Sequence, residues 1–286
     1  MNFKSKTPVI MRLKDFSVSK EVFELHYNKQ YDMLETQPKP ASSVLPKYYA
    51  SEDYISHTDG KRTFFEKIYQ FVRSIALSSK ASLVASHANG KTVLDIGAGT
   101  GDFLSRMNTL GWYSEGYEPN GKATTIAISK GVKVHSDMEL IENEYFEVIT
   151  MWHVLEHVSN LNDQLNFINR RLTETGVIIV AVPNFKSFDA KFYKKYWAGY
   201  DVPRHLWHFS QKSIELLFAE KGFKVVCTKP MWFDAFYVSM LSEKYKGRKF
   251  SFLRGLCIGF LSNLSACLSG EFSSLIYVLK RSKSDF

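Results

Sequence analysis

The sequence is poor in cysteine and has no apolar segment at its start. Three cysteines occur among 286 residues, Cys227, Cys257 and Cys267, and none lies in a CxxC pair or beside a cluster of histidines. We therefore expect neither a disulfide framework nor a structural zinc site, and this cysteine usage fits a reducing, cytoplasmic environment. The first twenty residues lack the continuous apolar core of a signal peptide.

The longest apolar stretch, residues 250–268, is repeatedly interrupted. One charged residue, two glycines and two polar residues break it: Arg254, Gly255, Gly259, Ser262 and Asn263. A membrane-spanning helix needs roughly 20 clean apolar residues. The sequence therefore predicts no transmembrane segment.

Basic residues outnumber acidic residues, 37 to 29, and give a formal net charge of +8. Such a balance favours an anionic partner such as RNA, acidic lipid or a phosphorylated metabolite. The charge is scattered, however, and its densest runs, 191–195 and 244–249, are typical of solvated helix faces. A nucleic-acid partner is therefore left open, but the charge alone does not argue for one.

Short apolar strands alternate with helices along most of the chain. Strands are expected at 92–96, 114–118, 132–135, 147–151, 177–182, 223–227 and 274–280, and helices at 102–110, 121–130, 160–172 and 211–221. Strands separated by helices require parallel pairing through right-handed crossovers. The sequence thus predicts an α/β fold with a Rossmann-like, doubly wound seven-stranded sheet, an N-terminal helical segment and helical insertions.

The part of the chain before this alternation has a different pattern. Residues 1–60 are polar and are expected to be irregular, and three prolines between residues 38 and 46 exclude a continuous helix there. From residue 62 to 87 apolar residues recur at helical spacing, up to an Asn-Gly turn. We interpret 1–88 as an N-terminal extension and helical cap, and 89–286 as the main domain, with insertions at 184–210 and 229–272.

The most informative motif is VLDIGAGTG at residues 93–101, where a predicted strand runs into a glycine-rich loop and then a helix. Glycines permit positive φ and remove the Cβ atoms that would hold a ligand away from the backbone. The spacing Asp95-x-Gly97-x-Gly99-x-Gly101 differs from the G-x-G-x-x-G of dinucleotide sites. Asp95 is positioned to attract a cation, and Ala98 lies between the first two glycines.

Two further acidic residues follow the next two strands. Glu118, in GYEPN with Pro119, can accept hydrogen bonds from both hydroxyls of a ribose. Asp137, in HSDMEL, can contact an adenine amine while Met138 covers the ring. Glu118 and Asp137 could also serve only as caps of the helices that follow them. All three carboxylates at successive strand ends indicate S-adenosylmethionine (SAM) rather than a nicotinamide cofactor.

These motifs, with HVLEHV at 153–158 and VPRHLWHFS at 202–210, resemble the class I SAM-dependent methyltransferases. The resemblance is strongest to the branch that includes the ubiquinone-pathway O-methyltransferases and covers about residues 90–230. It implies that Asp95 and the glycines surround the methionyl end, Glu118 binds the ribose, and Asp137 and Met138 lie near adenine. It also implies an antiparallel seventh strand. Some relatives carry an N-terminal zinc module, but no cysteine precedes Cys227.

Candidates for catalysis follow the fourth strand, whose end faces the sulfonium. Trp152 is expected at the cofactor, and a helical turn would place His153 and His157 on one face as candidate general bases. Either histidine could instead be structural. The H-x-x-E-H spacing with Glu156 also allows a metal site, but Mg²⁺ prefers oxygen ligands. No metal is therefore assigned.

Other segments are expected to shape the acceptor pocket. Arg204 could fix an anionic group and His205 could act as an alternative base, although Arg204 could simply pair with Asp201. Tyr54 and His57 could close over the cofactor. Residues 231–272, rich in Phe, Leu and Tyr, would suit a helical cap over an apolar acceptor, a membrane contact, buried cap helices or a homodimer interface.

The sequence therefore indicates a SAM-dependent methyltransferase acting at oxygen on a small-molecule or lipid-like acceptor. The N/D-P-P-Y/F signature of nucleobase amine methylation is absent after the fourth strand. Two alternatives stay open: an RNA- or protein-modifying methyltransferase, suggested by the basic charge, and a SAM-binding protein without activity.

Overall fold

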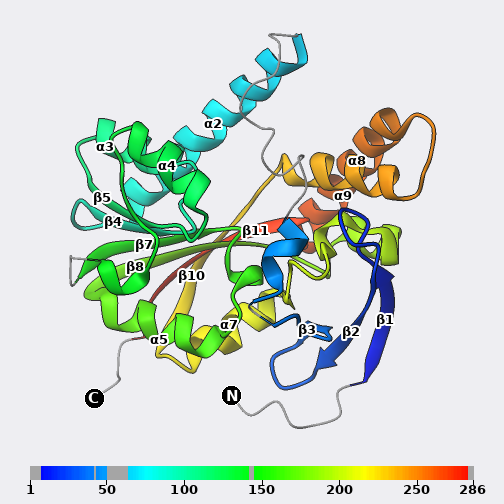
Figure 1. Cartoon of the computed structure of the whole chain (residues 1–286), viewed down its shortest axis with the longest axis horizontal. Coiled ribbons are helices and arrows are strands. Elements are labelled where there is room, and N and C mark those ends of the chain that lie inside the picture. The colour runs from blue at the N-terminus through cyan, green and yellow to red at the C-terminus, as the bar shows by residue number, and fades with distance from the viewer. Residues whose placement is uncertain (1–7, 42, 50–63, 142–144, 283–286) are drawn as a thin grey trace.

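The computed structural model describes residues 8–41, 43–49, 64–141 and 145–282, with side chains from residue 73 onward in the third range. Its centre is a seven-stranded sheet in the order β10-β11-β8-β7-β4-β5-β6 (Figure 1). The strands are β4 (Thr92–Ile96), β5 (Tyr113–Tyr117), β6 (Lys133–His135), β7 (Phe146–Trp152), β8 (Leu172–Pro183), β10 (Phe223–Pro230) and β11 (Ser274–Arg281).

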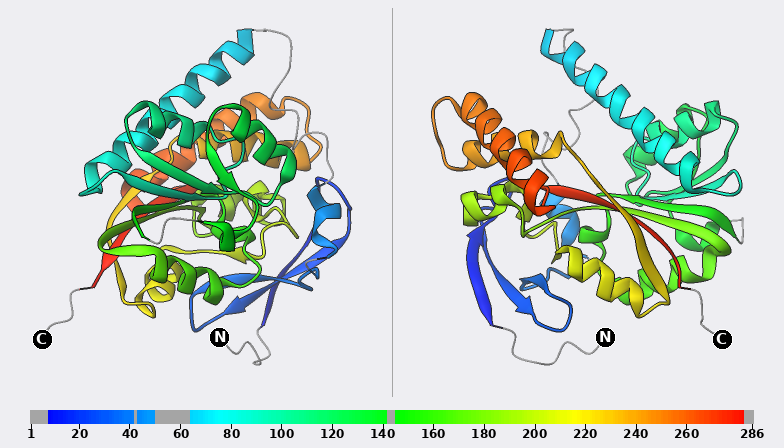
Figure 2. Two further views of the ribbon diagram at one scale, coloured as in Figure 1. Left: turned by 60° about the vertical axis from the view of Figure 1, so that its left-hand side comes forward. Right: turned by 180° about the vertical axis from the view of Figure 1, so that it is seen from behind.

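All neighbouring strands are parallel except around β11, which runs antiparallel to both β8 and β10. The predicted Rossmann-like sheet and its antiparallel last strand are confirmed. Helices cover both faces (Figures 1 and 2). One face carries α2 (Phe64–His87), α3 (Asp102–Thr109) and α4 (Gly121–Ser129), and the other carries α5 (Leu161–Arg171) and α7 (Gln211–Ala219).

Successive side chains of a strand point to opposite faces of the sheet, so one sheet contributes to a hydrophobic core on each face. In β4, Val93 packs into the core under α2, α3 and α4, whereas Leu94 and Ile96 pack into the core under α5 and α7. All three side chains are at most 1% exposed. Strands buried on both faces read as continuous apolar runs, which is why the sequence located them so well.

The N-terminal segment corrects the expectation of an irregular extension. It forms a second, antiparallel sheet, β1-β2-β3-β9, from β1 (Val9–Lys14), β2 (Val22–Asn28), β3 (Met33–Gln37) and β9 (Trp207–His208). Apolar residues at alternate positions, such as Phe23 and Leu25, are buried in it. Arg12, Lys14 and Glu24 on these strands are polar, and the surrounding loops are polar too, so the composition resembled a loop. The last strand comes from the distant 184–210 insertion.

The two insertions contain the remaining α-helices. The first holds α6 (Phe188–Tyr193) and short 3-10 turns, and the second holds a helical hairpin, α8 (Asp234–Tyr245) and α9 (Ser251–Ser269). Among the described residues, α9 is long and apolar enough to cross a membrane by length and composition, but a single such helix is weak evidence for a span. Its inner side packs along α8, which is not the arrangement of an isolated span.

Candidate functional site

The site lies where the direction of the sheet's connections reverses. β4 has β5 on one side and β7 on the other, so the loops that follow β4 and β7 diverge and leave a crevice at the carboxyl ends of the strands. A cavity of about 760 Å³ lies there. Five of the predicted site residues line it: Gly97, Pro119, Asp137, Met138 and His157.

The glycine loop has the geometry that the sequence predicts. Gly97, Gly99 and Gly101 all have positive φ, at 76°, 54° and 76°. A Cβ atom on Gly97 would lie 2.3 Å from Val154 Cγ2, and one on Gly101 would lie 2.8 Å from Ala127 Cβ. A Cβ atom on Gly99 would meet nothing within 4 Å. Gly99 therefore faces open space, as a residue that lets a ligand approach the backbone should.

Asp95 is the penultimate residue of β4 and is buried, with 2% of its surface exposed. Its carboxylate accepts a hydrogen bond of 2.5 Å from Thr150 Oγ1. Burial raises the pKa of Asp95 to about 7, and the Thr150 hydrogen bond and the charge of Lys80 only partly offset this rise. A cation placed beside Asp95 would favour its charged form, so the side chain suits a ligand ammonium.

Glu118 follows β5, and its carboxylate contacts the glycine loop after β4. It accepts hydrogen bonds from the backbone N–H of Gly99 at 2.9 Å and of Asn120 at 2.8 Å. Asp137 caps the 3-10 turn η2 (Met138–Leu140) by accepting from Glu139 N–H at 3.0 Å, and it also lines the cavity. The capping role weighed for Asp137 is thus present alongside its place at the site.

Trp152, at the end of β7, lies next to a lysine that the sequence did not single out. The Lys80 ammonium, from α2, lies 4.5 Å from the centre of the Trp152 ring. Burial lowers the pKa of Lys80, while the charges of Asp95 and Asp234 oppose this shift. The indole also packs edge-on against Phe103, with 5.6 Å between the ring centres. Nothing in the local sequence marks Lys80, because α2 joins the site only through tertiary packing.

His153 does not share a helical face with His157. It has a left-handed φ of 58°, and only the 3-10 turn η3 (Leu155–His157) follows it. Its Nδ1 lies 3.3 Å from Glu156 Oε1 and its Nε2 lies 3.0 Å from Asp234 Oδ2.

These contacts decide the protonation state of His153. Burial lowers its pKa, but the hydrogen bonds to Asp234 and Glu156 outweigh burial and raise the pKa to about 10. The ring is therefore an imidazolium at neutral pH, with no lone pair. The expectation that His153 acts as a base is not supported by this geometry.

His157 is the opposite case. Burial and the charge of His205 lower its pKa to about 4, so the ring is neutral at physiological pH. Its Nδ1 lies 3.1 Å from the Arg204 carbonyl oxygen and 3.1 Å from the Tyr49 hydroxyl. The carbonyl can only accept and the hydroxyl can also accept, so a proton on Nδ1 satisfies both contacts. The Nε2 lone pair is thereby left for other contacts, and the ring lines the cavity.

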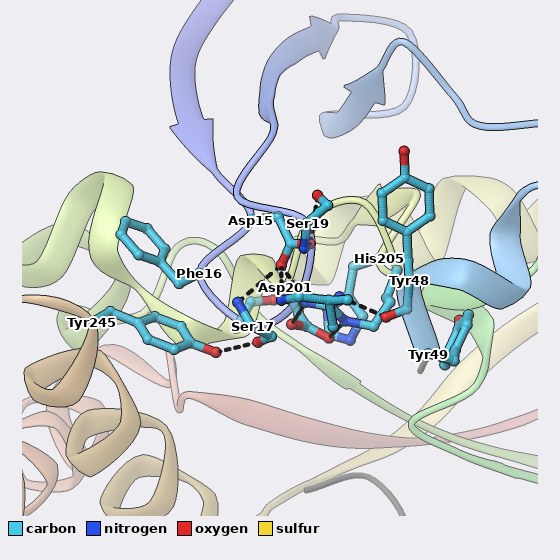
Figure 3. Close-up of polar contacts among 12 residues, drawn as sticks. Asp15, Phe16, Ser17, Ser19, Tyr48, Tyr49, Asp201, His205 and Tyr245 are labelled. Carbon is cyan, nitrogen blue, oxygen red and sulfur yellow. Dashed lines mark hydrogen bonds and ion pairs between the residues drawn. The ribbon is translucent and has the colours of Figure 1, made fainter. Parts of the chain in front are cut away.

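Arg204 is a structural residue rather than a ligand contact. Its guanidinium is 4% exposed and lies 2.6 Å from Asp201 and 3.1 Å from Asp15, and it also donates to the Tyr48 carbonyl. Figure 3 labels Asp15, Asp201 and Tyr48 of this cluster. Asp15 belongs to the loop between β1 and β2 and also accepts from the Ser19 N–H. The pairing of Arg204 with Asp201 is therefore confirmed, and this cluster fixes the N-terminal sheet against the 184–210 insertion.

His205 follows Arg204 and packs edge-on against His157, with 4.6 Å between the ring centres. Its Nδ1 lies 2.9 Å from the Gly199 carbonyl oxygen. Glu156, His157 and His205 each offer a ligand atom within 4.8 Å of the others. If a cation binds, this triad and not the His153 side chain would hold it. Tyr54 and His57 lie outside the described residues.

Comparison with known proteins identifies the family. A family model described as a methyltransferase domain matches residues 68–228. The chain belongs to this family. A search of the curated proteins found no match.

Two solved structures illustrate how this methyltransferase relates to others of the same fold. Magnesium protoporphyrin IX methyltransferase from Synechocystis, with bound S-adenosylhomocysteine, is 14% identical with a TM-score of 0.55, over 85% of this chain and 100% of that one. Geranyl diphosphate C-methyltransferase from Streptomyces coelicolor is 13% identical with a TM-score of 0.53. The match covers 78% of this chain and 88% of that one. The fold is that of class I SAM-dependent methyltransferases, and SAM is the methyl donor that it implies.

Proposed function

We propose that this methyltransferase transfers the methyl group of SAM to an oxygen atom of a small or lipid-like acceptor, with His157 accepting the acceptor's proton. One observation carries the proposal. One cavity is lined by Gly97 of the glycine loop, by Asp137 and Met138, which we assign to the adenine side, and by the neutral His157. Donor and acceptor would therefore meet in one cavity, as direct transfer requires.

The residues fit the cofactor. The open space at Gly99 admits a ligand to the backbone, and buried Asp95 favours the methionyl ammonium. Glu118 would accept from the ribose hydroxyls, and Met138 would cover the adenine. Trp152 and the adjacent Lys80 would form the remaining part of the cofactor site. When bound, SAM supplies an electrophilic methyl group on a sulfonium.

The lining favours an apolar acceptor. Leu45, Val154, Val158 and Phe167 contribute apolar surface, and Arg170 and Arg171 add positive charge to the same cavity. An acceptor with an apolar body and an anionic or polar end suits this distribution. The two neighbours named above carry porphyrin and geranyl diphosphate in their names, which are acceptors of this general kind. A polymer such as RNA suits the cavity less well.

His157 and His153 would have different roles in the reaction. His157 is neutral and keeps its Nε2 lone pair, which is the form a general base needs. His153 is held as an imidazolium between Glu156 and Asp234, so it would position the end of β7 against α8 and add positive charge. Arg204, through its backbone carbonyl, would fix the tautomer of His157.

The test uses SAM labelled on its methyl group and a panel of phenolic, isoprenoid and carboxylic acceptors. His157→Gln should lower kcat about 10²- to 10⁴-fold, since that is the usual contribution of a general base. The dissociation constant for SAM, measured by calorimetry, should not change. His87→Gln, at the distant end of α2, is the matched control and should behave as wild type.

Two results would overturn the proposal. One is a His157→Gln variant with the wild-type rate on an identified acceptor. The other is label that enters RNA or protein and no small-molecule or lipid fraction. The first would remove the base assignment alone, and the second would replace the acceptor class.

A further inference from the structure

The large apolar residues of helix α9 face outward, and its small and polar residues face the protein. Its buried residues are small or polar: Gly255, Gly259, Ser262, Asn263 and Ala266. Its large apolar residues face outward, with exposed fractions of 61% for Leu253, 61% for Phe260, 45% for Leu261, 55% for Leu264 and 93% for Leu268. At 100° per residue these five side chains fall within one arc of the helix. We call this arc, with Phe250 (78% exposed) at its start, the α9 ridge.

The packing against α8 explains why the small side is turned inward. A Cβ atom on Gly255 would lie 2.5 Å from Met240 Cα, and one on Gly259 would lie 2.8 Å from Phe236 Cα. The two helices therefore approach at backbone distance, and Asn263 donates to the Trp232 carbonyl at 2.9 Å. A helix held this tightly cannot roll to bury its ridge. The hairpin lies at the periphery of the molecule (Figures 1 and 2).

The hairpin carries a positive net charge. Residues 231–270 contain five basic residues and two acidic residues, a net charge of +3. Both acidic residues are engaged inside the fold, Asp234 with His153 and Glu243 with Arg254, at 3.0 Å and 3.4 Å. The exposed charge next to the ridge is therefore positive.

Three basic residues between the last turn of α8 and the start of α9 are exposed: Lys244, Arg248 and Lys249. Arg248 and Lys249 immediately precede Phe250, the first residue of the ridge. An exposed ridge of leucine and phenylalanine beside basic side chains is what a helix lying in a bilayer interface presents, with the apolar face among the acyl chains and the cations at anionic headgroups.

We propose that the α8–α9 hairpin docks this methyltransferase on the surface of a membrane that contains anionic lipid, with the α9 ridge inserted in the interface. The helix lies on the membrane and does not cross it, because its inner side belongs to the contact with α8. Asp234, the first residue of α8, contacts His153 at the end of β7, so the docked element adjoins the candidate site. The proposal does not rest on the identity of the acceptor.

The test is co-sedimentation of the full chain with phosphatidylcholine vesicles, with and without phosphatidylglycerol. We expect the mixed vesicles to bind about a hundredfold more tightly, since each of three basic residues contributes about tenfold or less near an anionic surface. Binding to mixed vesicles should weaken at high salt.

Two double variants separate the apolar and the charged contributions to vesicle binding. Phe260→Ser with Leu264→Ser should weaken vesicle binding about tenfold or more by removing inserted apolar surface. Ile128→Ser, on α4 and 57% exposed, is the control and should change nothing. Arg248→Glu with Lys249→Glu should abolish the preference for phosphatidylglycerol, whereas Lys122→Glu with Lys212→Glu, an equal charge change on α4 and α7, should preserve it.

SAM titration of each variant reports whether the fold is intact, and the charge pair keeps the test valid if the ridge pair fails to fold. Three results would overturn the proposal: no binding to mixed vesicles, equal binding to both kinds of vesicle, or ridge variants that bind vesicles normally. A wild-type dimer that dissociates in the ridge variants, in sedimentation velocity, with no vesicle binding, would show that a second copy covers the ridge instead.

Discussion

Gly99→Ala tests the cofactor site with little disturbance of the fold. Gly99 has a φ of 54° and a Cβ atom there would meet nothing within 4 Å, so the free protein has room for the methyl group. Gly131 is its matched control. It has a φ of 73° and the same open surroundings, but it follows α4, away from the cavity. The two substitutions impose the same kind of backbone strain at different places.

The expected magnitudes follow from this comparison. A non-glycine residue in the left-handed region costs about 1–2 kcal/mol, so both variants should lose that much free energy of unfolding. At Gly99 the new methyl group also occupies space that we assign to SAM. Overpacking of this kind costs about 1–3 kcal/mol, which corresponds to SAM binding weakened about tenfold to a hundredfold.

Urea denaturation measures the first quantity and calorimetric titration with SAM measures the second. Gly97→Ala provides the contrast, because its Cβ would lie 2.3 Å from Val154 Cγ2 and should destabilise the fold itself more strongly. The reasoning is refuted if Gly99→Ala binds SAM with the wild-type dissociation constant, or if Gly131→Ala weakens SAM binding to the same degree.

Three further variants probe individual side chains. Glu118→Gln should weaken SAM binding about tenfold in calorimetry, since a charged acceptor is replaced by a neutral one; wild-type affinity would contradict the ribose assignment. His153 has a folded-state pKa of about 10 against 6.5, so its contribution is complete below pH 6.5 and is lost as pH rises toward 10. Urea denaturation should show the largest deficit of His153→Gln below pH 6.5, and a deficit independent of pH would argue against the imidazolium. Arg204→Gln leaves Asp15 and Asp201 without their cation and should cost about 3–5 kcal/mol of unfolding free energy; a loss under about 1 kcal/mol would mean that the cluster is not structural.

The sequence by itself determined the central sheet and the glycine loop. Strands such as β4 are buried on both faces, so their apolar runs are visible locally, and Gly99 and Gly101 mark positive φ wherever they fold. Carboxylates at the ends of successive parallel strands must meet at one edge, which made Asp95, Glu118 and Asp137 recognisable. These features depend on near neighbours in the chain, and a single sequence contains that information.

Tertiary structure decided what distant segments do to one another. Asp15 and Arg204 lie 189 residues apart, and β3 pairs with β9 from an insertion. The two histidines of HVLEHV look equivalent in sequence, yet Asp234 keeps His153 charged while burial keeps His157 neutral. A pKa is set by the solvent and charges around a group, and the chain acquires those surroundings only when it is packed.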